Sequence, residues 1–398
     1  MEVRIIKKEE LLESNKISAV AFQYSYDCKV DENDSYPNDC ECEYGAFDDD
    51  GKMMGRMAAI QHELYFDGHI VKATGIGGVA TLPEYRHKKA IRKIFELVFE
   101  DMKAKNQYIS QLYPFSFSYY NKFNYETTYE QINLKFPIYL LEERKDIERN
   151  NRCKLIDDNK NIVMREAYEK YASRHNGAYK RDDSLWEGKL SKNIYDRKQY
   201  PYVYFNEENE PAGYFVFNRD KDNFNIIELC YDTPADIKGI LGFIRNFSSD
   251  YDDIKIDNFP LSEDFSLMFT NQYDVSRSPA FKAMTCIANA EKIFELMKYP
   301  LDRGSFSISV NDEFQPCNKG VYHISYNDGK AIDVEQKAFG SSDVDIDVSA
   351  IALAKLVFGT DNLSSHRYKY MDGIKINGNA DILNQVFVKK DIYIGDYY

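Results

Sequence analysis

A run of basic side chains interrupts a chain that is acidic elsewhere. The segment 75–102 reads GIGGVATLPEYRHKKAIRKIFELVFEDM, and its basic residues are Arg86, His87, Lys88, Lys89, Arg92 and Lys93. The formal net charge of the whole chain is −14. A strand that ends at Leu82-Pro83 and continues as a helix leaves the first helical N–H groups unpaired, and those groups attract an anion. The pattern indicates a cradle for a polyphosphate.

The strand before the basic run offers a second kind of contact. Val79, Ala80 and Thr81 can present free backbone N–H and C=O groups if the sheet splays there. An amide-bearing chain would then pair with them like an added strand. The alternative reading of the same segment is an ordinary amphipathic helix with a basic first turn.

The rest of the composition excludes other kinds of site. Net acidity argues against a nucleic-acid partner, because phosphate-backbone binding needs a broad basic face. The seven cysteines show no CxxC spacing, and Cys40 and Cys42 have no His or second Cys pair for zinc, so we expect reduced thiols and no metal. The opening MEVRIIKKEELLESNK has no signal-peptide apolar region, and no segment reaches the roughly 20 apolar residues of a membrane span. We expect a cytoplasmic protein without a membrane span.

The segment 31–50, DENDSYPNDCECEYGAFDDD, carries nine carboxylates and no Lys or Arg. One interpretation is a solvated loop followed by an edge strand. The other is an acidic rim that draws in a cationic substrate.

The elements around the basic run predict an α/β unit with a mixed sheet. Asp50-Gly51 and Asp67-Gly68 are hairpin signals, so residues 41–82 form an antiparallel meander. Apolar residues from Ile91 to Met102 then follow the helical period for about five turns after Pro83. YISQLYP predicts a further strand, and YETTYEQINLKFPIYLL supplies two strands that close the unit.

A weaker copy of this pattern follows. Aligning the prolines sets GVATLPEYRHKKAIRKIF against LCYDTPADIKGILGFIRN, in which Asp232 and Asp236 replace the basic run. A duplicated fold with one working phosphate site is the economical interpretation. A third unit, rich in strands, begins around Cys286 and ends in the aromatic tail IYIGDYY. We therefore divide the chain into domains 1–148, 149–285 and 286–398.

The segment GGVATLPEYRHKKAIRKIF resembles the central motif of the GNAT acetyltransferases, a strand followed by Pro-x-x-Arg-x-x-Gly-x-Gly/Ala. The resemblance implies that coenzyme A lies with its pantetheine along the strand and its pyrophosphate at the helix start. Lys89 and Ile91 stand where small residues are usual, and a missing glycine is expected to narrow the approach to the phosphates. The implied cofactor-binding residues are Gly78, Val79, Ala80, Thr81, Arg86, His87, Lys88, Lys89, Ala90 and Ile91.

Tandem GNAT-like units followed by a unit similar to a sterol carrier protein resemble the enhanced intracellular survival (Eis-like) acetyltransferases. In that family Tyr-Pro precedes Tyr-x-x-Phe-x-Tyr, and YPFSFSYYNKFNYE places Tyr120 at the general-acid position. The resemblance further implies that the C-terminal carboxylate, here on Tyr398, deprotonates the amine, and that Phe22 and Glu126 bind the substrate. It also implies an apolar concavity in the third unit.

These roles agree with the chemistry of acetyl transfer. A thioester reacting with an amine needs a donor for the developing oxyanion and a proton for the departing thiolate. The backbone N–H of Val79 would serve as that donor. Tyr120 would supply the proton, because a tyrosine with a pKa of about 10 stays protonated at neutral pH.

We expect an N-acetyltransferase that carries an acetyl group from acetyl-CoA to a primary amine by direct transfer in a ternary complex. The resemblance suggests a cationic acceptor, such as an aminoglycoside, a polyamine or lysine, and a homo-oligomer, namely a hexamer. Two alternatives stay open. One is a non-catalytic acyl-CoA or lipid-binding protein. The other is a longer-chain N-acyltransferase similar to the N-myristoyltransferases, which also pair two GNAT-like halves.

Overall fold

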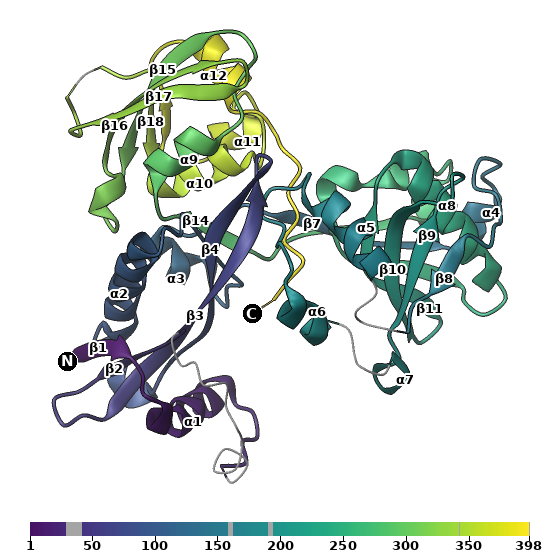
Figure 1. Cartoon of the computed structure of the whole chain (residues 1–398), viewed down its shortest axis with the longest axis horizontal. Coiled ribbons are helices and arrows are strands. Elements are labelled where there is room, and N and C mark those ends of the chain that lie inside the picture. The colour runs from purple at the N-terminus through teal and green to yellow at the C-terminus, as the bar shows by residue number, and fades with distance from the viewer. Residues whose placement is uncertain (29–41, 158–161, 190–193, 342, 398) are drawn as a thin grey trace.

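Three lobes, each built on its own sheet, make up the molecule (Figure 1). This computed structural model describes residues 1–28, 42–157, 162–189, 194–341 and 343–397. In these residues each sheet combines antiparallel pairs with a parallel pair, which is β4–β5 in the first, β11–β12 in the second and β15–β18 in the third. The predicted α/β fold class with mixed sheets is confirmed.

The first sheet has the strand order β1-β2-β3-β4-β5-β14-β6. Its strands are β1 Glu2–Ile5, β2 Glu43–Phe47, β3 Met53–Phe66, β4 His69–Thr81, β5 Ile109–Leu112, β14 Met284–Ile287 and β6 Glu126–Thr127. The helices of this lobe are α1 Leu11–Phe22, α2 Ala90–Ala104 and α3 Phe117–Tyr120. The apolar side of α2 packs on the sheet and forms one cluster with residues of β3, β4 and β5.

The predicted meander is confirmed, and its second hairpin turn also joins the lobes. Asp67 and Gly68 both have positive φ, 49° and 86°, as a two-residue hairpin turn requires. The Asp67 carboxylate accepts hydrogen bonds from the backbone N–H of Lys298 at 2.8 Å and from Nζ of Lys390 at 2.6 Å. The backbone N–H of Asp67 donates to the side chain of Asn176 at 2.7 Å. The tip of the first sheet is therefore bound to both other lobes.

The predicted start of the long helix is wrong. Pro83–Tyr85 forms a single 3-10 turn, and α2 begins only at Ala90. His87 and Lys89 have φ of 66° and 64°, which an α-helix cannot contain. The basic residues 86–89 therefore form a loop before the helix rather than its first turn.

Two strands cross the expected domain boundaries. β7, Glu130–Pro137, pairs with β12 and β13 of the second sheet, so the prediction that it closes the first unit is wrong. β14 pairs with β5 and β6 and completes the first sheet from the far end of the second lobe. The ranges 1–148, 149–285 and 286–398 stay a proposal about the units, and these exchanged strands link them.

The second sheet has the order β13-β7-β12-β11-β10-β9-β8. Its other strands are β8 Cys153–Leu155, β9 Tyr200–Phe205, β10 Pro211–Asp220, β11 Asn223–Tyr231, β12 Asp253–Pro260 and β13 Ser276–Phe281. The helices of this lobe are α4 Tyr139–Glu142, α5 Ile162–Ala172, α6 Asp183–Lys189, α7 Ile194–Arg197 and α8 Pro234–Ile244. As in the first lobe, a parallel strand pair flanks the helix that follows a proline.

The third sheet has the order β17-β16-β15-β18-β19. Its strands are β15 Gly304–Asn311, β16 Gly320–Asn327, β17 Lys330–Lys337, β18 Ile346–Ser349 and β19 Ile374–Ile376. Its helices are α9 Ala290–Leu296, α10 Ala350–Phe358, α11 His366–Lys369 and α12 Ala380–Val386. Among the described residues, no helix of any lobe combines the length and the apolar character needed to cross a membrane.

The tail that follows α12 leaves the third lobe and runs between the other two (Figure 1). Its anchor is Asp396, whose side chain is 5% exposed and lies 3.0 Å from Nη2 of the fully buried Arg181. Lys189 contacts the same carboxylate at 2.9 Å, and Glu228 accepts from Arg181 in the same cluster. Burial alone would raise the pKa of Asp396, but Arg181 and Lys189 outweigh it and hold that pKa below its ordinary value.

Replacing Arg181 with methionine should lower the free energy of unfolding by about 3–5 kcal/mol, because among the described residues the two buried carboxylates would keep only Lys189 as a cationic partner. Urea unfolding monitored by circular dichroism measures this change. In the native protein the stabilisation from Asp396 should be complete above about pH 5 and lost as the pH falls below the ordinary carboxyl value of about 4.

Arg219→Met is the matched control, since Arg219 lies 3.9 Å from Asp222 in an exposed pair of the same lobe. It should change stability by less than about 1 kcal/mol. Equal losses of stability in the two variants would contradict the conclusion that the contact between Arg181 and Asp396 anchors the tail.

Candidate active site

The strands β4 and β5 part beside the predicted site. Their parallel pairing covers only Ala73–Ile76 of β4 and Ile109–Leu112 of β5. β4 continues to Thr81, so in the described structure residues 77–81 pair with β3 on one side and with no strand on the other. β4 and β5 therefore separate where the sequence analysis expected the sheet to splay. An extended ligand can pair with the free edge of β4.

An irregularity lies within the same stretch of β4. Ala58 pairs with Gly77 and Arg56 with Ala80, so Gly78 and Val79 together oppose the single residue Met57. Gly78 has φ 54°, the left-handed region in which glycine carries no penalty. This β-bulge rotates the peptide groups of Gly78 and Val79 out of the ladder, which is a common way of aiming backbone groups at a ligand.

The loop after β4 gathers cations that lack acidic partners. Arg86, His87, Lys88 and Lys89 are all exposed, and within the described residues no carboxylate forms an ion pair with Arg86, Lys88 or Lys89. Arg92 and Lys93, one turn into α2, contact Glu96 instead, at 3.4 Å and 2.7 Å. The loop therefore retains net positive charge, whereas the helix does not.

Lys89 keeps the backbone conformation that glycine usually supplies. Its φ and ψ are 64° and 18°, and the side chain is exposed. A non-glycine residue in this region costs about 1 kcal/mol or more, so the turn is built at some expense of stability. The expected effect of the missing glycine on the phosphate approach stays a prediction.

The first turn of α2 is open to a ligand. No described side chain caps it, whereas Ala90 and Ile91 are buried against the sheet. In the second lobe the equivalent start of α8 is closed, since the Asp236 carboxylate accepts from N and Oγ1 of Thr233 at 3.0 Å and 2.6 Å. The first lobe thus has a helix start that no described side chain caps, and the second fills the same place with its own carboxylate.

Tyr120 lies at the end of α3, held by the aromatic residues that follow it. Phe123 stacks on Phe95 of α2 with ring centroids 4.3 Å apart, and the Tyr125 hydroxyl lies 2.6 Å from Oγ of Ser110. Tyr120 itself packs edge-on against Phe95 at 6.5 Å. Its apolar cluster also contains Ala90 and Ile91, with Val79 packed against it. The fold therefore brings Tyr120, the bulge and the helix start together.

The Tyr120 hydroxyl is available for a ligand. The residue is 3% exposed, yet no hydrogen bond from the described residues reaches its oxygen. Burial, with a smaller contribution from Tyr119, raises the pKa of Tyr120 above its ordinary value. The phenol therefore stays protonated at neutral pH, as a proton donor must.

Two residues expected to bind substrate are not members of this apolar cluster, although Glu126 directly follows Tyr125 and accepts a hydrogen bond from Asn121 at 3.4 Å. Glu126, in β6, accepts from N and Oγ1 of Thr127 and lies 3.6 Å from Nζ of Lys355 in α10. Its charge is therefore already compensated. Phe22, the last residue of α1, is 52% exposed and presents a free aromatic ring to solvent. Both roles stay predictions.

The tail reaches the first lobe at Tyr113, directly after β5. The Tyr113 hydroxyl donates to the carbonyls of Ile394 at 3.1 Å and Asp396 at 3.0 Å. Its ring stacks on Tyr397 with centroids 4.2 Å apart. Tyr398 lies outside the described residues, so its catalytic role stays a prediction.

The acidic segment 31–50 is partly outside the description, and three of the four carboxylates described in it have partners of their own. Glu43 pairs with Arg56, Asp48 accepts from the Tyr85 hydroxyl at 2.8 Å, and Asp49 binds the terminal amine of Met1 at 2.8 Å. These three give little support to an acidic rim. Residues 31–41 belong to the undescribed part.

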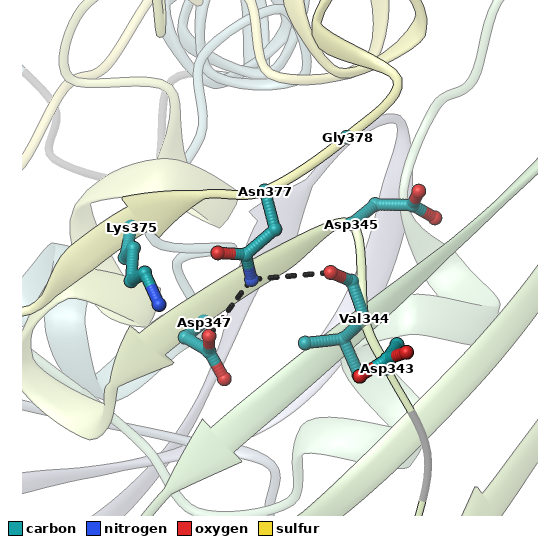
Figure 2. Close-up of a pocket in the computed structure, with 7 residues that line it drawn as sticks. All are labelled: Asp343, Val344, Asp345, Asp347, Lys375, Asn377 and Gly378. Carbon is teal, nitrogen blue, oxygen red and sulfur yellow. Dashed lines mark hydrogen bonds between the residues drawn. The ribbon is translucent and has the colours of Figure 1, made fainter.

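A polar pocket of about 590 Å³ lies on the third lobe, beside β18 and β19 (Figure 2). Three aspartates, Asp343, Asp345 and Asp347, line it, and Asn377 donates to Oδ2 of Asp347 at 2.9 Å. It is therefore not the apolar concavity implied by the sterol-carrier resemblance. Among the described residues no group of His, Cys, Asp or Glu side chains is arranged to hold a metal ion.

Two residues of the site are not among those predicted from the sequence. Arg56, inside a predicted strand, contacts the bulge carbonyl of Gly78 at 3.2 Å. Tyr113 holds the tail although the two segments are far apart in the chain. A buried arginine in an apolar strand is unusual, and that feature alone could have drawn attention to Arg56.

Comparison with known families and structures agrees with this geometry. Residues 2–128 and 177–284 each match a family model described as an acetyltransferase (GNAT) domain, and residues 290–394 match a sterol carrier protein domain. A search of curated proteins gives no match.

Solved structures share the complete fold. A conserved protein from Enterococcus faecalis V583, titled a probable N-acyltransferase, is 22% identical with a TM-score of 0.82, covering 100% of this chain and 99% of that one. A GCN5-related N-acetyltransferase from Anabaena variabilis is 20% identical, with full coverage of both chains and a TM-score of 0.82. Eis1 from Mycobacterium abscessus is 14% identical, again with full coverage of both chains, and has a TM-score of 0.81.

These findings confirm the resemblance predicted from the sequence. At such identities the structural likeness establishes the fold, and the domain matches establish the enzyme class. The chain is an acetyltransferase of the GNAT type, in which two GNAT domains and a C-terminal sterol carrier protein domain share the fold of Eis1.

Proposed function

We propose that the protein transfers the acetyl group of acetyl-CoA to a primary amine of a cationic acceptor, within a ternary complex. The observation that carries this proposal is the start of α2, where the described residues supply no side-chain cap, no acidic partner for the loop cations and no strand along the β5 side of residues 77–81. Coenzyme A combines a pyrophosphate with an amide-bearing arm, and this combination of surfaces suits both parts.

Each part of acetyl-CoA is bound by a different group of residues. Arg86, Lys88 and Lys89, with the first N–H groups of α2, hold the phosphates. The edge of β4 from Gly78 to Thr81 pairs with the pantetheine amides. The Val79 N–H donates to the thioester carbonyl, whose oxygen gains negative charge in the transition state.

The reaction balances with one general acid. The amine nitrogen attacks the thioester carbonyl carbon, a C–N bond forms, and the C–S bond breaks. The departing thiolate takes the proton of Tyr120, and the phenolate recovers a proton that the amine releases through solvent. Tyr398 would accept that proton first if its carboxylate acts as the family resemblance implies.

Direct transfer is favoured over a covalent acetyl-enzyme. The cysteine in the same apolar cluster as Tyr120 is Cys286, and burial raises the pKa of its thiol well above the ordinary value. A thiol in that state supplies almost no thiolate, the nucleophilic form. The acetyl group would therefore pass straight to the amine.

The proposed class of acceptor, a cationic amine, is inferred from the side chains that could contact it. The exposed ring of Phe22 can contact a cation through its face, and Glu126 can share its charge between Lys355 and an acceptor. Aminoglycosides, polyamines and lysine side chains are the candidates to screen. A hexameric assembly and a cytoplasmic location belong to the same proposal and rest on the sequence and the resemblance.

The first experiment is a calorimetric titration of the protein with acetyl-CoA, coenzyme A and palmitoyl-CoA in turn. Micromolar binding of acetyl-CoA at one site per chain supports the proposal. Preference for palmitoyl-CoA would point to a longer-chain acyltransferase, and binding of fatty acid without coenzyme A to a lipid-binding protein. An amine screen with acetyl-CoA then identifies the acceptor.

Replacing Tyr120 with phenylalanine should lower kcat by roughly 10²-fold or more and leave the Kd for acetyl-CoA within a few-fold, because only the proton donor is lost. Steady-state kinetics and calorimetry measure the two quantities. Tyr119→Phe is the matched control, since Tyr119 is the adjacent, half-buried tyrosine, and its kcat should stay within about twofold. Equal turnover of Tyr120→Phe and the native enzyme would remove Tyr120 from the mechanism.

Replacing Arg86 with glutamine should weaken coenzyme A binding by about tenfold, the value of one charge-assisted phosphate contact. The affinity should also depend less steeply on salt. Lys93→Gln is the matched control, because Lys93 already pairs with Glu96 at 2.7 Å and should change the Kd less than twofold. If both variants bind equally well, the phosphates lie elsewhere.

The pH profile should reflect the raised pKa of Tyr120. The value of kcat/KM should rise between pH 7 and 9 as the acceptor amine loses its proton. It should not fall before about pH 10, because burial keeps the phenol protonated beyond its ordinary pKa of about 10. A decline that begins near pH 8 and disappears in Tyr120→Phe would contradict this assignment.

A further inference from the structure

The peptide between Gly78 and Val79 is held from one side by a buried arginine. Nη1 of Arg56 donates to the Gly78 carbonyl at 3.2 Å. The Arg56 side chain is 9% exposed, and the bulge places Gly78 and Val79 opposite Met57 of the same strand as Arg56. The guanidinium therefore contacts the bulge at its first residue.

Because the peptide is planar and trans, the contact at the Gly78 carbonyl also fixes the direction of the Val79 N–H. The C=O of Gly78 and the N–H of Val79 belong to one planar group and point in opposite directions. With the carbonyl bound to Arg56, the Val79 N–H is directed away from the guanidinium. Rotating that N–H would require breaking the contact with Arg56.

The arginine is itself fixed by two further elements. Its Nη1 also donates to Oγ of Ser18 in α1 at 2.9 Å. Its Nη2 pairs with Glu43 of β2. Three secondary-structure elements thus converge on one guanidinium, so its position leaves little freedom to the Gly78 carbonyl.

The fit between Arg56 and Gly78 is close. A Cβ atom on residue 78 would lie 2.1 Å from Nη1 of Arg56, so only glycine leaves room for the guanidinium. The φ of 54° at Gly78 selects the same residue. The space beside Arg56 and the positive φ therefore both require glycine at residue 78. This indicates that the contact with Arg56 is part of the structure of the bulge.

One donor of the buried arginine, its Nε atom, is buried and has no hydrogen-bond partner among the described residues. Burying a guanidinium with an unsatisfied donor is unfavourable, and an apolar side chain would fill the same volume without that cost. A role in orienting the peptide accounts for the retention of charge here.

We propose that Arg56 is a positioning residue for catalysis, which orients the Val79 N–H toward the carbonyl oxygen of the bound thioester. Arg56 acts through the peptide and does not touch the substrate. This inference rests on the proposed function, because it assigns the support of the oxyanion donor named there.

The test compares ligands that differ by the carbonyl that Val79 binds. S-acetonyl-CoA is a stable ketone analogue of acetyl-CoA, and coenzyme A lacks the carbonyl. Arg56→Lys keeps the charge but replaces the two-nitrogen fork, in which Nη2 pairs with Glu43 while Nη1 donates to Ser18 and Gly78, with a single amine. We expect its Kd for coenzyme A to stay within twofold, its Kd for S-acetonyl-CoA to rise about tenfold, and kcat to fall by at least the same factor.

The matched control is Arg4→Lys in the same sheet. Arg4 forms a two-pronged contact with Glu10 at 2.7 Å, and neither residue forms a hydrogen bond or ion pair with the described side chains of β4. This variant should leave both dissociation constants and kcat unchanged. Ser18→Ala provides a milder test that preserves the arginine, and its Kd for S-acetonyl-CoA should rise about threefold.

The outcomes separate the inference from the proposed function. If Arg56→Lys and Ser18→Ala bind both ligands and turn over like the native enzyme, Arg56 has only a structural role and the inference is overturned. A parallel loss of affinity for both ligands also overturns it, since a distorted site would not discriminate. Failure of the native protein to bind coenzyme A at all would instead remove the proposed function.

Discussion

The parting of β4 from β5 after four paired residues is the constraint on which the first lobe depends. The bulge at Gly78 and Val79 follows directly after this pairing while β4 stays paired with β3, and the free edge on the β5 side is what an amide-bearing ligand can use. β5 does not become an exposed edge, because β14 pairs with its other side. Since β14 arrives from the end of the second lobe, the sheet of the first GNAT domain is complete only in the full chain. Cofactor site and domain order are therefore coupled.

The two GNAT domains show how a duplicated fold can divide its tasks. Both contain a parallel strand pair and, between those strands, a helix preceded by or beginning at a proline. Both therefore have a helix start that could bind an anion. In the second domain Asp236 satisfies that helix start, and its carboxylate also excludes a phosphate by like charge. The buried face of the same domain instead carries Arg181, which binds Asp396 of the tail. The second domain thus contributes to the first by fixing the position of the tail beside Tyr113.

Local rules account for what the sequence could predict. The Asp67-Gly68 turn follows from the dihedral angles that two-residue hairpins require, and the aromatic spacing around Tyr120 follows from a motif of a few residues. The start of α2 was misplaced because His87 and Lys89 adopt left-handed angles that their residue types disfavour. The assignment of β7 failed for a different reason, since its partners β12 and β13 are more than a hundred residues away. The role of Arg56 could not be predicted from the sequence, because its partners come from three separate elements.

The left-handed lysine at residue 89 is intelligible as a compromise between strain and charge. Glycine would adopt the same angles without the cost of about 1 kcal/mol, but it would leave one cation fewer in the loop. The whole chain has a net charge of −14, so a ligand with several phosphates is repelled over most of the surface. The strain is a cost to the folded state, whereas the charge acts when a phosphate binds, and an exposed cation then contributes up to about 1 kcal/mol. In an acidic enzyme, a lysine where relatives of the motif use glycine can therefore favour cofactor binding, provided that the backbone keeps the turn, as it does here.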